Sequence, residues 1–302
     1  MLPLIAGPTA SGKSALAVAL AEIAGGEVVS ADSRQVYREL EIGTAKPDAA
    51  QRARVPHHFV DERSLAEPFT AGQFAREAEA RIAAILSRGA VPVVAGGSTL
   101  YLEALVHGLG AMPPAVPALR AHLEDVARTP GGRQALFDEL RAADPETAAT
   151  LDPTKSQRLV RMVEVLRSTG RAPAAFRRQV ARPRYRFLVC VLDWPRQTLY
   201  ARIDARVDAM LAAGLIEENR RLLEAFPELD TPALRTIGYR ESRAYLRGEC
   251  TFEEMVTRLK RNSRRYAKRQ LTWFRRHPEY VWIDGRTARA EEIYARWRGA
   301  TT

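Results

Sequence analysis

The stretch GPTASGKS, residues 7–14, matches the pattern G-x-x-x-x-G-K-[ST] of a phosphate-binding P-loop. In such a loop, backbone N–H groups and the start of a helix point at phosphate oxygens. We expect Lys13 to reach the phosphates and the Ser14 hydroxyl to bind Mg²⁺. The pattern leaves three uses of the phosphate open: hydrolysis as an energy source, transfer of the phosphate group to an acceptor, or departure as a leaving group.

Two aspartates at the ends of predicted strands are candidates for acid–base or metal chemistry. Asp32 follows the second predicted strand, Glu27–Ala31, and Asp193 ends the run RFLVCVLD. Each could bind the metal, act as a general base or cap a helix. We favour Asp32, because ligands of parallel sheets bind at the carboxyl ends of the strands. A motor ATPase would place an acid after the strand Val91–Ala95, where this chain has two glycines.

A basic segment, residues 258–277, holds nine Lys or Arg and no acid. As a helix it would carry two rows of cations and one apolar face: Lys260, Arg264 and Lys268; Arg261, Arg265 and Arg269; and Leu259, Ala267, Leu271 and Phe274. Like charges at this spacing repel, so the rows cost stability unless an anion lies against them. Tyr266 and Trp273 could stack on exposed bases or only pack. The segment predicts a nucleic-acid surface, with a solvated surface helix as the alternative.

The net charge is +10 over 302 residues, and it is unevenly distributed. Residues 1–112 hold 10 Lys+Arg and 12 Asp+Glu, whereas residues 113–302 hold 36 and 24, so the later part carries the basic surface.

The cysteines, Cys190 and Cys250, are too few for a zinc site built on cysteine and indicate thiols of a reducing cytosol. No apolar run is long enough to cross a membrane, and the early P-loop leaves no room for a signal peptide. We therefore expect a cytoplasmic protein.

The alternation of strands and helices predicts an α/β fold, a P-loop NTPase-like parallel sheet core with a helical insertion domain. A proline-rich linker near residue 113 marks the change of pattern. The predicted boundaries are 1–113 and 184–302 for the core and 114–183 for the insertion. The expected strands are Leu2–Ala6, Glu27–Ala31, Val91–Ala95, Arg186–Leu192 and Tyr280–Ile283. The expected helices are Ser14–Ala24, a helix capped by Thr70 and ending near Gly89, and helices near 118–127, 132–142, 155–168, 196–213, 216–225 and 252–277.

Seven sequence blocks occur in a familiar order: GPTASGKS, SADSRQVYRELEIGTAKP, VPHHFVD, VVAGGSTLYLEALVHGL, SQRLVRMVEVL, LRTIGYRES and AKRQLTWFRR. This order resembles the bacterial tRNA dimethylallyltransferase family, also called tRNA isopentenyltransferases. The resemblance extends from Leu2 to about Ile283. A small-molecule kinase would share only the P-loop.

The resemblance implies transfer of a dimethylallyl group from dimethylallyl diphosphate to N6 of adenine 37, next to the tRNA anticodon. The bound phosphate would then be a leaving group, held with Mg²⁺. The catalytic residues would be Asp32 as general base, Lys13, and an arginine of the segment ARIDAR, for which we favour Arg206 over Arg202. The diphosphate loop would comprise Gly7, Pro8, Thr9, Ala10, Ser11, Gly12, Lys13 and Ser14.

The resemblance also implies which residues face tRNA. They are Asp32, Ser33, Arg34, Gln35, Ser98, Arg120, Gln157, Arg158, Leu159, Val160, Arg161, Arg235, Thr236, Ile237, Gly238, Tyr239, Arg240, Lys268, Arg269, Gln270, Leu271, Thr272, Trp273, Phe274 and Arg275. We expect a monomer with no membrane partner. A prenyltransferase of free adenine nucleotides, a small-molecule kinase and a non-catalytic RNA-binding protein are the alternatives.

Overall fold

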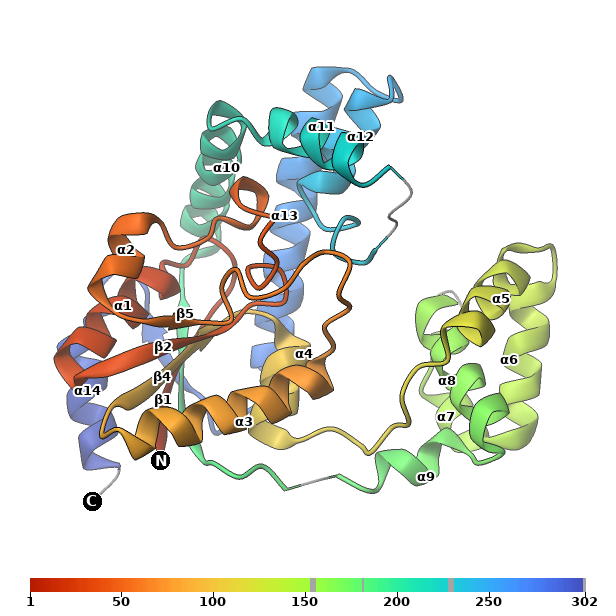
Figure 1. The fold of residues 1–302 in the computed structure, drawn as a ribbon, viewed down its shortest axis with the longest axis horizontal. Helices are drawn as coiled ribbons and strands as arrows, with labels where there is room; N and C mark the ends of the chain where they lie inside the picture. The colour runs from red at the N-terminus through yellow and green to blue at the C-terminus, as the bar shows by residue number, and fades with distance from the viewer. Residues whose placement is uncertain (153–155, 181, 228–230, 301–302) are drawn as a thin grey trace. The chain divides into compact units, whose positions relative to one another are not determined.

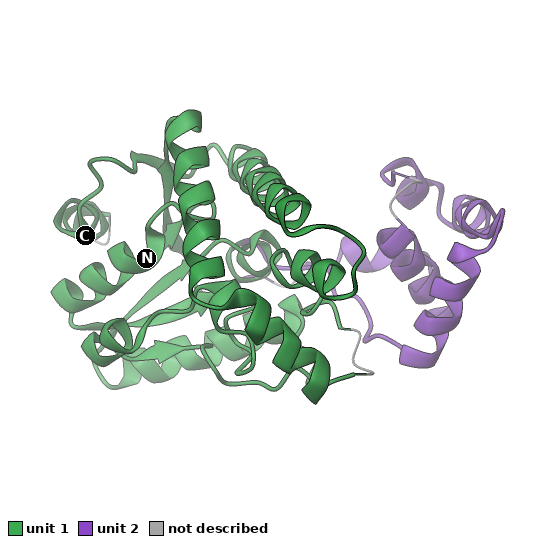
Figure 2. Cartoon of the chain, turned by 90° about the horizontal axis from the view of Figure 1, so that it is seen from above, with its two compact units in different colours: residues 1–106, 184–302 green, residues 107–183 purple. Residues whose placement is uncertain are grey.

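The computed structural model describes residues 1–152, 156–180, 182–227 and 231–300. The chain forms two compact units, residues 1–106 with 184–302 and residues 107–183 (Figure 2). The first boundary lies between 106 and 107, earlier than the predicted one after residue 113. The reason is local pairing: Gly110 bridges to Val180, and the Ala111 N–H donates to the Gln179 carbonyl at 3.0 Å. The start of the insertion is thereby paired with its own end.

The first unit is built on a six-stranded sheet with the strand order β3-β2-β4-β1-β5-β6 (Figure 1). All of its strand pairs are parallel. The strands are β1 (Leu2–Ala6), β2 (Gly26–Ala31), β3 (His57–His58), β4 (Val91–Gly96), β5 (Phe187–Asp193) and β6 (Val281–Asp284). Because parallel strands are covered on both faces, β1 and β2 are buried at every residue, including Glu27 and Ser30 of β2.

Some helices of the first unit lie against this sheet, and others lie beyond it, at the top of Figure 1. They are α1 (Lys13–Ala24), α2 (Ala49–Arg54), α3 (Ala71–Ser87), α4 (Thr99–Leu102), α10 (Arg196–Ala212), α11 (Leu215–Ala225), α12 (Tyr239–Leu246), α13 (Phe252–Phe274) and α14 (Ala290–Gly299). A 3₁₀ turn, η1, spans Ile42–Thr44, and a π-helical turn, η2, spans Glu103–His107. Residues of α1 and α14 share one core cluster with four strands, including Val18, Ile293, Ile5 and Val93. This packing fixes α1, and with it the end of the P-loop.

The second unit is helical, as the sequence predicts. Its helices are α5 (Pro117–Arg128), α6 (Gly132–Ala143), α7 (Pro145–Ala149), α8 (Ser156–Thr169) and α9 (Pro173–Arg177). The unit has a core of its own, which includes Leu123, Leu136, Leu140 and Val163. The predicted start of α8 at residue 155 lies outside the described residues.

The long elements lie where the hydrophobic pattern predicts them, and several short ones were not predicted. Thr70 caps α3 as expected, with its hydroxyl accepting from the Gln73 N–H at 3.2 Å. Helices α2, α4, α7, α9, α12 and α14 and strand β3 were missed, because elements this short or polar carry little periodicity. Among the described residues, no helix combines the length and apolar character needed to cross a bilayer.

Candidate active site

The P-loop connects β1 to α1 in a tight path. Ala10 and Gly12 have φ angles of 63° and 90°, in the left-handed region. A Cβ atom on Gly7 would lie 2.7 Å from the Ser11 hydroxyl oxygen, so only glycine fits there. The Ser11 Oγ is buried and has no hydrogen-bond partner among the described residues. A phosphate-sized anion in the loop would provide one, since buried polar groups are ordinarily satisfied.

Three side chains bind the loop backbone. The Thr9 N–H donates to Gln270 Oε1 at 2.9 Å. Arg202 Nε donates to the Ala10 carbonyl at 2.8 Å, and Trp194 Nε1 donates to the Ser11 carbonyl at 3.0 Å. The Arg202 guanidinium also lies 4.3 Å from the centre of the Trp194 ring. These contacts fix the orientation of successive peptide groups in the loop.

A cavity opens beside the P-loop at the carboxyl ends of β2 and β4, where ligands of parallel sheets bind. Its wall comes from the loop, the segments after β2 and β4, and helices α10 and α13. The lining residues are Thr9, Lys13, Ser14, Val28, Ser30, Asp32, Gln35, Ala45, Pro47, His57, Ala95, Gly96, Gly97, Arg206, Tyr266 and Gln270. The predicted Asp32, Lys13, Ser14 and Arg206 are therefore brought together, whereas Arg202 and Asp193 do not line the cavity.

The cavity gathers two cations, Lys13 and Arg206, with which no carboxylate in the described part of the chain forms an ion pair. Lys13 Nζ donates to the Pro8 carbonyl at 3.4 Å, and Arg206 Nη2 donates to the Thr44 carbonyl at 3.3 Å. Desolvation and the Arg206 charge lower the pKa of Lys13 to about 8, against an opposing effect of Asp32. Burial also lowers the pKa of Arg206, again opposed by Asp32. A bound anion would relieve both.

Asp32 is held with one carboxylate oxygen engaged. Its Oδ1 accepts the N–H of Arg34 at 2.9 Å and that of Gln35 at 3.4 Å. None of the hydrogen bonds found in the described parts of the chain uses Oδ2. One oxygen thus orients the group, and the other is available to take a proton or bind a cation. Asp193 instead accepts from the Trp194 N–H at 3.0 Å, which is a turn contact.

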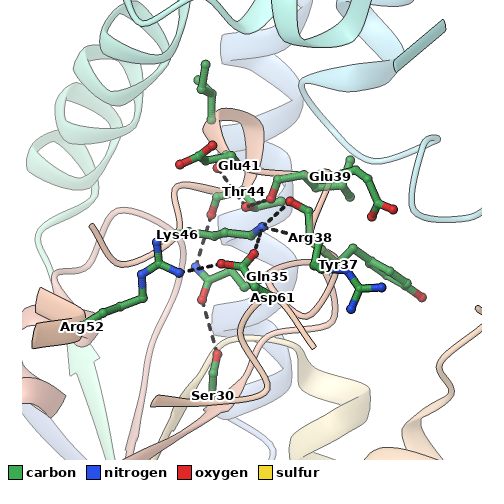
Figure 3. A network of polar contacts seen from close by, with 12 residues as sticks. Ser30, Gln35, Tyr37, Arg38, Glu39, Glu41, Thr44, Lys46, Arg52 and Asp61 are labelled. Carbon is green, nitrogen blue, oxygen red and sulfur yellow. Dashed lines mark hydrogen bonds and ion pairs between the residues drawn. The ribbon is translucent and has the colours of Figure 1, made fainter. Parts of the chain in front are cut away.

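The cavity wall after β2 is held by a polar network (Figure 3). Gln35 Nε2 donates to the carbonyls of Thr44 and Ala45 at 3.3 and 3.1 Å, and Ser30 donates to Gln35 at 3.3 Å. Lys46 Nζ donates to the Tyr37 carbonyl at 2.7 Å and pairs with Asp61. The Thr44 carbonyl that also receives Arg206 is therefore fixed in place.

Tyr266 and Gln270 are cavity residues that the sequence did not reveal as such. They lie one turn apart on α13 and face the cavity together. Burial and the Asp32 charge raise the pKa of Tyr266 to about 12, so the phenol stays protonated. The sequence signal that could have identified Gln270 as a cavity residue is a polar side chain among the apolar positions Ala267, Leu271 and Phe274.

The cations of α13 fall into two groups. Lys260 pairs with Asp208 at 2.6 Å and Arg264 with Asp204 at 2.7 Å, both on α10. The anion expected against this row is thus supplied partly by the protein itself. In contrast, Arg261, Arg265 and Arg269 are exposed, and no carboxylate of the described residues pairs with them. The apolar face is confirmed, with Leu259, Ala267 and Phe274 buried and Leu271 partly so.

Several side chains expected to face tRNA face the protein instead. Those of Leu159 and Val160 belong to the core of the second unit, and those of Tyr239 and Phe274 are fully buried in the first. Packing within the protein therefore accounts for these four side chains. Gln270 is 3% exposed and binds the P-loop.

Further members of that set have protein partners, among them two arginines of the second unit and a tryptophan of the first. Arg120 and Arg161 share the buried carboxylate of Glu164, at 2.5 and 2.8 Å. Trp273 packs on Phe274, His277 and Tyr280, with ring centres 4.6 to 6.2 Å apart. The predicted residues with exposed side chains include Gln157, Arg158, Arg235, Arg240, Lys268, Arg269, Thr272 and Arg275.

Comparison with known proteins now identifies the family. A family model described as IPP transferase matches residues 35–277. The chain belongs to the IPP transferase family. It is 48% identical to the tRNA dimethylallyltransferase of Salinibacter ruber, over 96% of this chain and 89% of the relative. It is 50% identical to tRNA dimethylallyltransferase 1 of Citrifermentans bemidjiense, over 93% of this chain and 91% of the relative.

Solved structures agree with this assignment. The full-length tRNA isopentenylpyrophosphate transferase from Bacillus halodurans matches with a TM-score of 0.71 and 39% identity, over 99% of this chain and 95% of that one. A eukaryotic dimethylallyltransferase acting on tRNA matches with a TM-score of 0.79 and 29% identity, over 94% and 73% of the two chains. The predicted family, the transferase class and the α/β fold of this IPP transferase are confirmed.

Proposed function

We propose that this IPP transferase family member moves a dimethylallyl group from dimethylallyl diphosphate to N6 of adenine 37 in tRNA. The relatives named above are tRNA dimethylallyltransferases. The observation that carries the proposal is a single cavity lined by Lys13, Arg206 and Asp32, in which no carboxylate of the described residues forms an ion pair with either cation. Such a site suits an anionic leaving group on one side and a proton acceptor on the other.

The reaction forms a bond between N6 and the allylic carbon and breaks the bond between that carbon and a diphosphate oxygen. An exocyclic adenine amine is a poor nucleophile, because its lone pair is delocalised into the ring. Asp32 would take the N6 proton as the new bond forms, using the Oδ2 oxygen. Lys13, Arg206 and the loop N–H groups would stabilise the charge that develops on the diphosphate.

The cavity also suits Mg²⁺. The Ser14 hydroxyl and the Asp32 carboxylate both line it, and Mg²⁺ prefers oxygen ligands. When bound beside the diphosphate, the ion would neutralise part of the leaving group's charge.

We assign the RNA contacts chiefly to the exposed row Arg261, Arg265 and Arg269 on α13. The Arg269 guanidinium carbon of this row lies 5.6 Å from the centre of the Tyr266 ring. The target adenine must leave its stack to reach the cavity, at a cost of a few kcal/mol. Exposed Gln157 and Arg158 on α8 are further candidates. Phosphate contacts of this kind position RNA, and hydrogen bonds to base edges then select the base.

A cytoplasmic monomer is part of the same proposal. Asp32, Lys13, Ser14 and Arg206 of one chain line one cavity, so the proposed chemistry requires no second copy.

The deciding experiment measures transfer of label from dimethylallyl diphosphate to an anticodon stem-loop that contains adenine 37. We expect transfer to the RNA and none to free AMP, and we expect no consumption of ATP. The variant Asp32→Asn should lose at least about a hundredfold in turnover while its RNA affinity stays within about twofold. Transfer to AMP but not to the stem-loop would exclude a tRNA substrate. Unchanged turnover in Asp32→Asn would remove Asp32 as the base.

A further inference from the structure

Gln270 makes two hydrogen bonds that join three parts of the site. Its Oε1 accepts the Thr9 N–H at 2.9 Å, and its Nε2 donates to the Gly97 carbonyl at 2.7 Å. Thr9 belongs to the P-loop, Gly97 follows β4, and Gln270 lies on α13. The amide is 3% exposed, so both bonds are made away from solvent. Buried hydrogen bonds of this kind are costly to leave unmade.

The position admits few side chains other than glutamine. One amide acts as acceptor and donor at once, which neither glutamate nor methionine can do. The space is tight, because a Cβ atom on Gly97 would lie 2.6 Å from Gln270 Nε2 and 2.9 Å from the Gly7 carbonyl. The glycine after β4 and the glutamine on α13 therefore fit one another.

The first of these bonds sets the position of Lys13. In a planar trans peptide, the C=O and the N–H point in opposite directions. Because Gln270 holds the Thr9 N–H, the Pro8 carbonyl of the same peptide points the other way. There it accepts Lys13 Nζ at 3.4 Å and the Ser11 N–H at 3.3 Å. A rotation of this peptide would remove the Lys13 contact and the turn together.

The other contacts to the loop act on different peptides. Arg202 and Trp194 bind the carbonyls of Ala10 and Ser11, and neither constrains the peptide between Pro8 and Thr9. Among the described residues, the Gln270 side chain is the one that holds the Thr9 N–H.

We propose that Gln270 is a positioning residue of the diphosphate site, which holds the Pro8–Thr9 peptide so that Lys13 meets the leaving group. The segment that contains it is otherwise expected to face tRNA. This assignment rests on the proposed function for the identity of the leaving group. It also means that the helix carrying the Arg261, Arg265 and Arg269 row sets the shape of the phosphate loop.

The test compares Gln270→Met with the wild-type protein and with a control on the same helix, Glu253→Gln. Glu253 is exposed in the first turn of α13, away from the cavity. Three measurements are made on each protein: calorimetry for the affinity for inorganic diphosphate, fluorescence anisotropy for the affinity for the stem-loop, and steady-state kinetics for KM and kcat with dimethylallyl diphosphate. We expect Gln270→Met to lose about tenfold in diphosphate affinity, with a matching rise in KM, while its stem-loop affinity stays within about twofold. The control should match the wild type.

Retained stem-loop affinity shows that the variant is folded, so a loss confined to diphosphate supports the assignment. A loss of stem-loop affinity with unchanged diphosphate affinity would assign Gln270 to RNA and overturn it, as would no change in either. The diphosphate measurement does not depend on RNA transfer. If the wild type transfers nothing to the stem-loop, the proposed function fails, while the role of Gln270 in the loop is still decided.

Discussion

The cations of helix α13 and those of the cavity are held in different ways. On α13, Lys260 and Arg264 meet carboxylates of α10 at 2.6 and 2.7 Å. In the cavity, the hydrogen bonds that Lys13 and Arg206 make within the described residues go to backbone carbonyls, at 3.4 and 3.3 Å. A carboxylate cancels a full charge, whereas a carbonyl offers only a dipole. The first pair is neutralised within the protein, and the second keeps its positive charge.

This difference separates two tasks. The pairs between α10 and α13 fasten the helix that carries Arg206 to the helix that carries Tyr266 and Gln270. The cavity cations stay partly desolvated, and the pKa values of both Lys13 and Arg206 are lowered. Their charge is therefore available to an anion that enters. The predictions below test this division.

The largest effect is expected at Arg206. Removing one well-placed donor from a developing anion costs about 10²- to 10³-fold in rate, and we expect Arg206→Gln to lose that much in kcat/KM for dimethylallyl diphosphate. Arg202→Gln should lose about tenfold or less, because Arg202 binds the Ala10 carbonyl and acts only through the loop. Steady-state kinetics of the two variants gives the comparison. Equal losses would mean that both arginines contact the diphosphate.

The P-loop could be predicted from the sequence because its geometry is local. A buried strand is followed at once by two glycines, Lys13 and Ser14, which lead into a helix. The backbone N–H groups that bind phosphate belong to the same short segment. Whether the charge of Arg264 is paired could not be predicted in the same way. Its partner Asp204 lies sixty residues earlier, so whether its charge is free or paired depends on how α10 packs on α13. Tertiary packing decides this, and no local pattern encodes it.

The same reason explains the tRNA-facing residues that turned out to be buried. A sequence block marks a segment, and it does not say which of its side chains turns inward. Val160 and Phe274 lie in segments with exposed cations, yet their own side chains lie in the two cores. Helical periodicity separates such faces only where the apolar positions are regular, as they are for Leu259, Ala267 and Phe274.

The next effect concerns RNA affinity. We expect the triple variant Arg261→Gln, Arg265→Gln, Arg269→Gln to bind the stem-loop about 30- to 100-fold more weakly at moderate salt. The slope of log K against log salt should fall by about 2 to 3, since each phosphate contact contributes about 0.7 to 0.9. Binding titrations at several salt concentrations measure both quantities.

The matched control replaces the paired cations of the same helix, Lys260 and Arg264, with glutamine. Because their charges are already compensated, the salt slope should stay within about one unit of the wild-type value. These pairs are partly exposed, so each should contribute at most about 1 kcal/mol to the free energy of unfolding. If the control lowered the slope as much as the triple variant, the division between paired and free cations would be wrong.

The smallest effect is a pH dependence that belongs to Lys13. Its pKa is about 8 in the folded protein and 10.5 as the ordinary value, so between these pH values the folded chain binds fewer protons than the unfolded chain. The contribution of Lys13 to stability therefore rises with pH across this window.

Binding of the diphosphate has the opposite dependence, because the anion requires the protonated form of Lys13. We expect the affinity for dimethylallyl diphosphate to fall above pH 8, by up to about tenfold per pH unit, and calorimetry from pH 7 to 9.5 follows it. In Lys13→Met the affinity should be lower throughout and flat over this range, since the other cavity cation, Arg206, does not titrate there. If the affinity of Lys13→Met still declined above pH 8, the titration would belong to another group. Lys13 would then not be the cation whose charge controls binding of the anion.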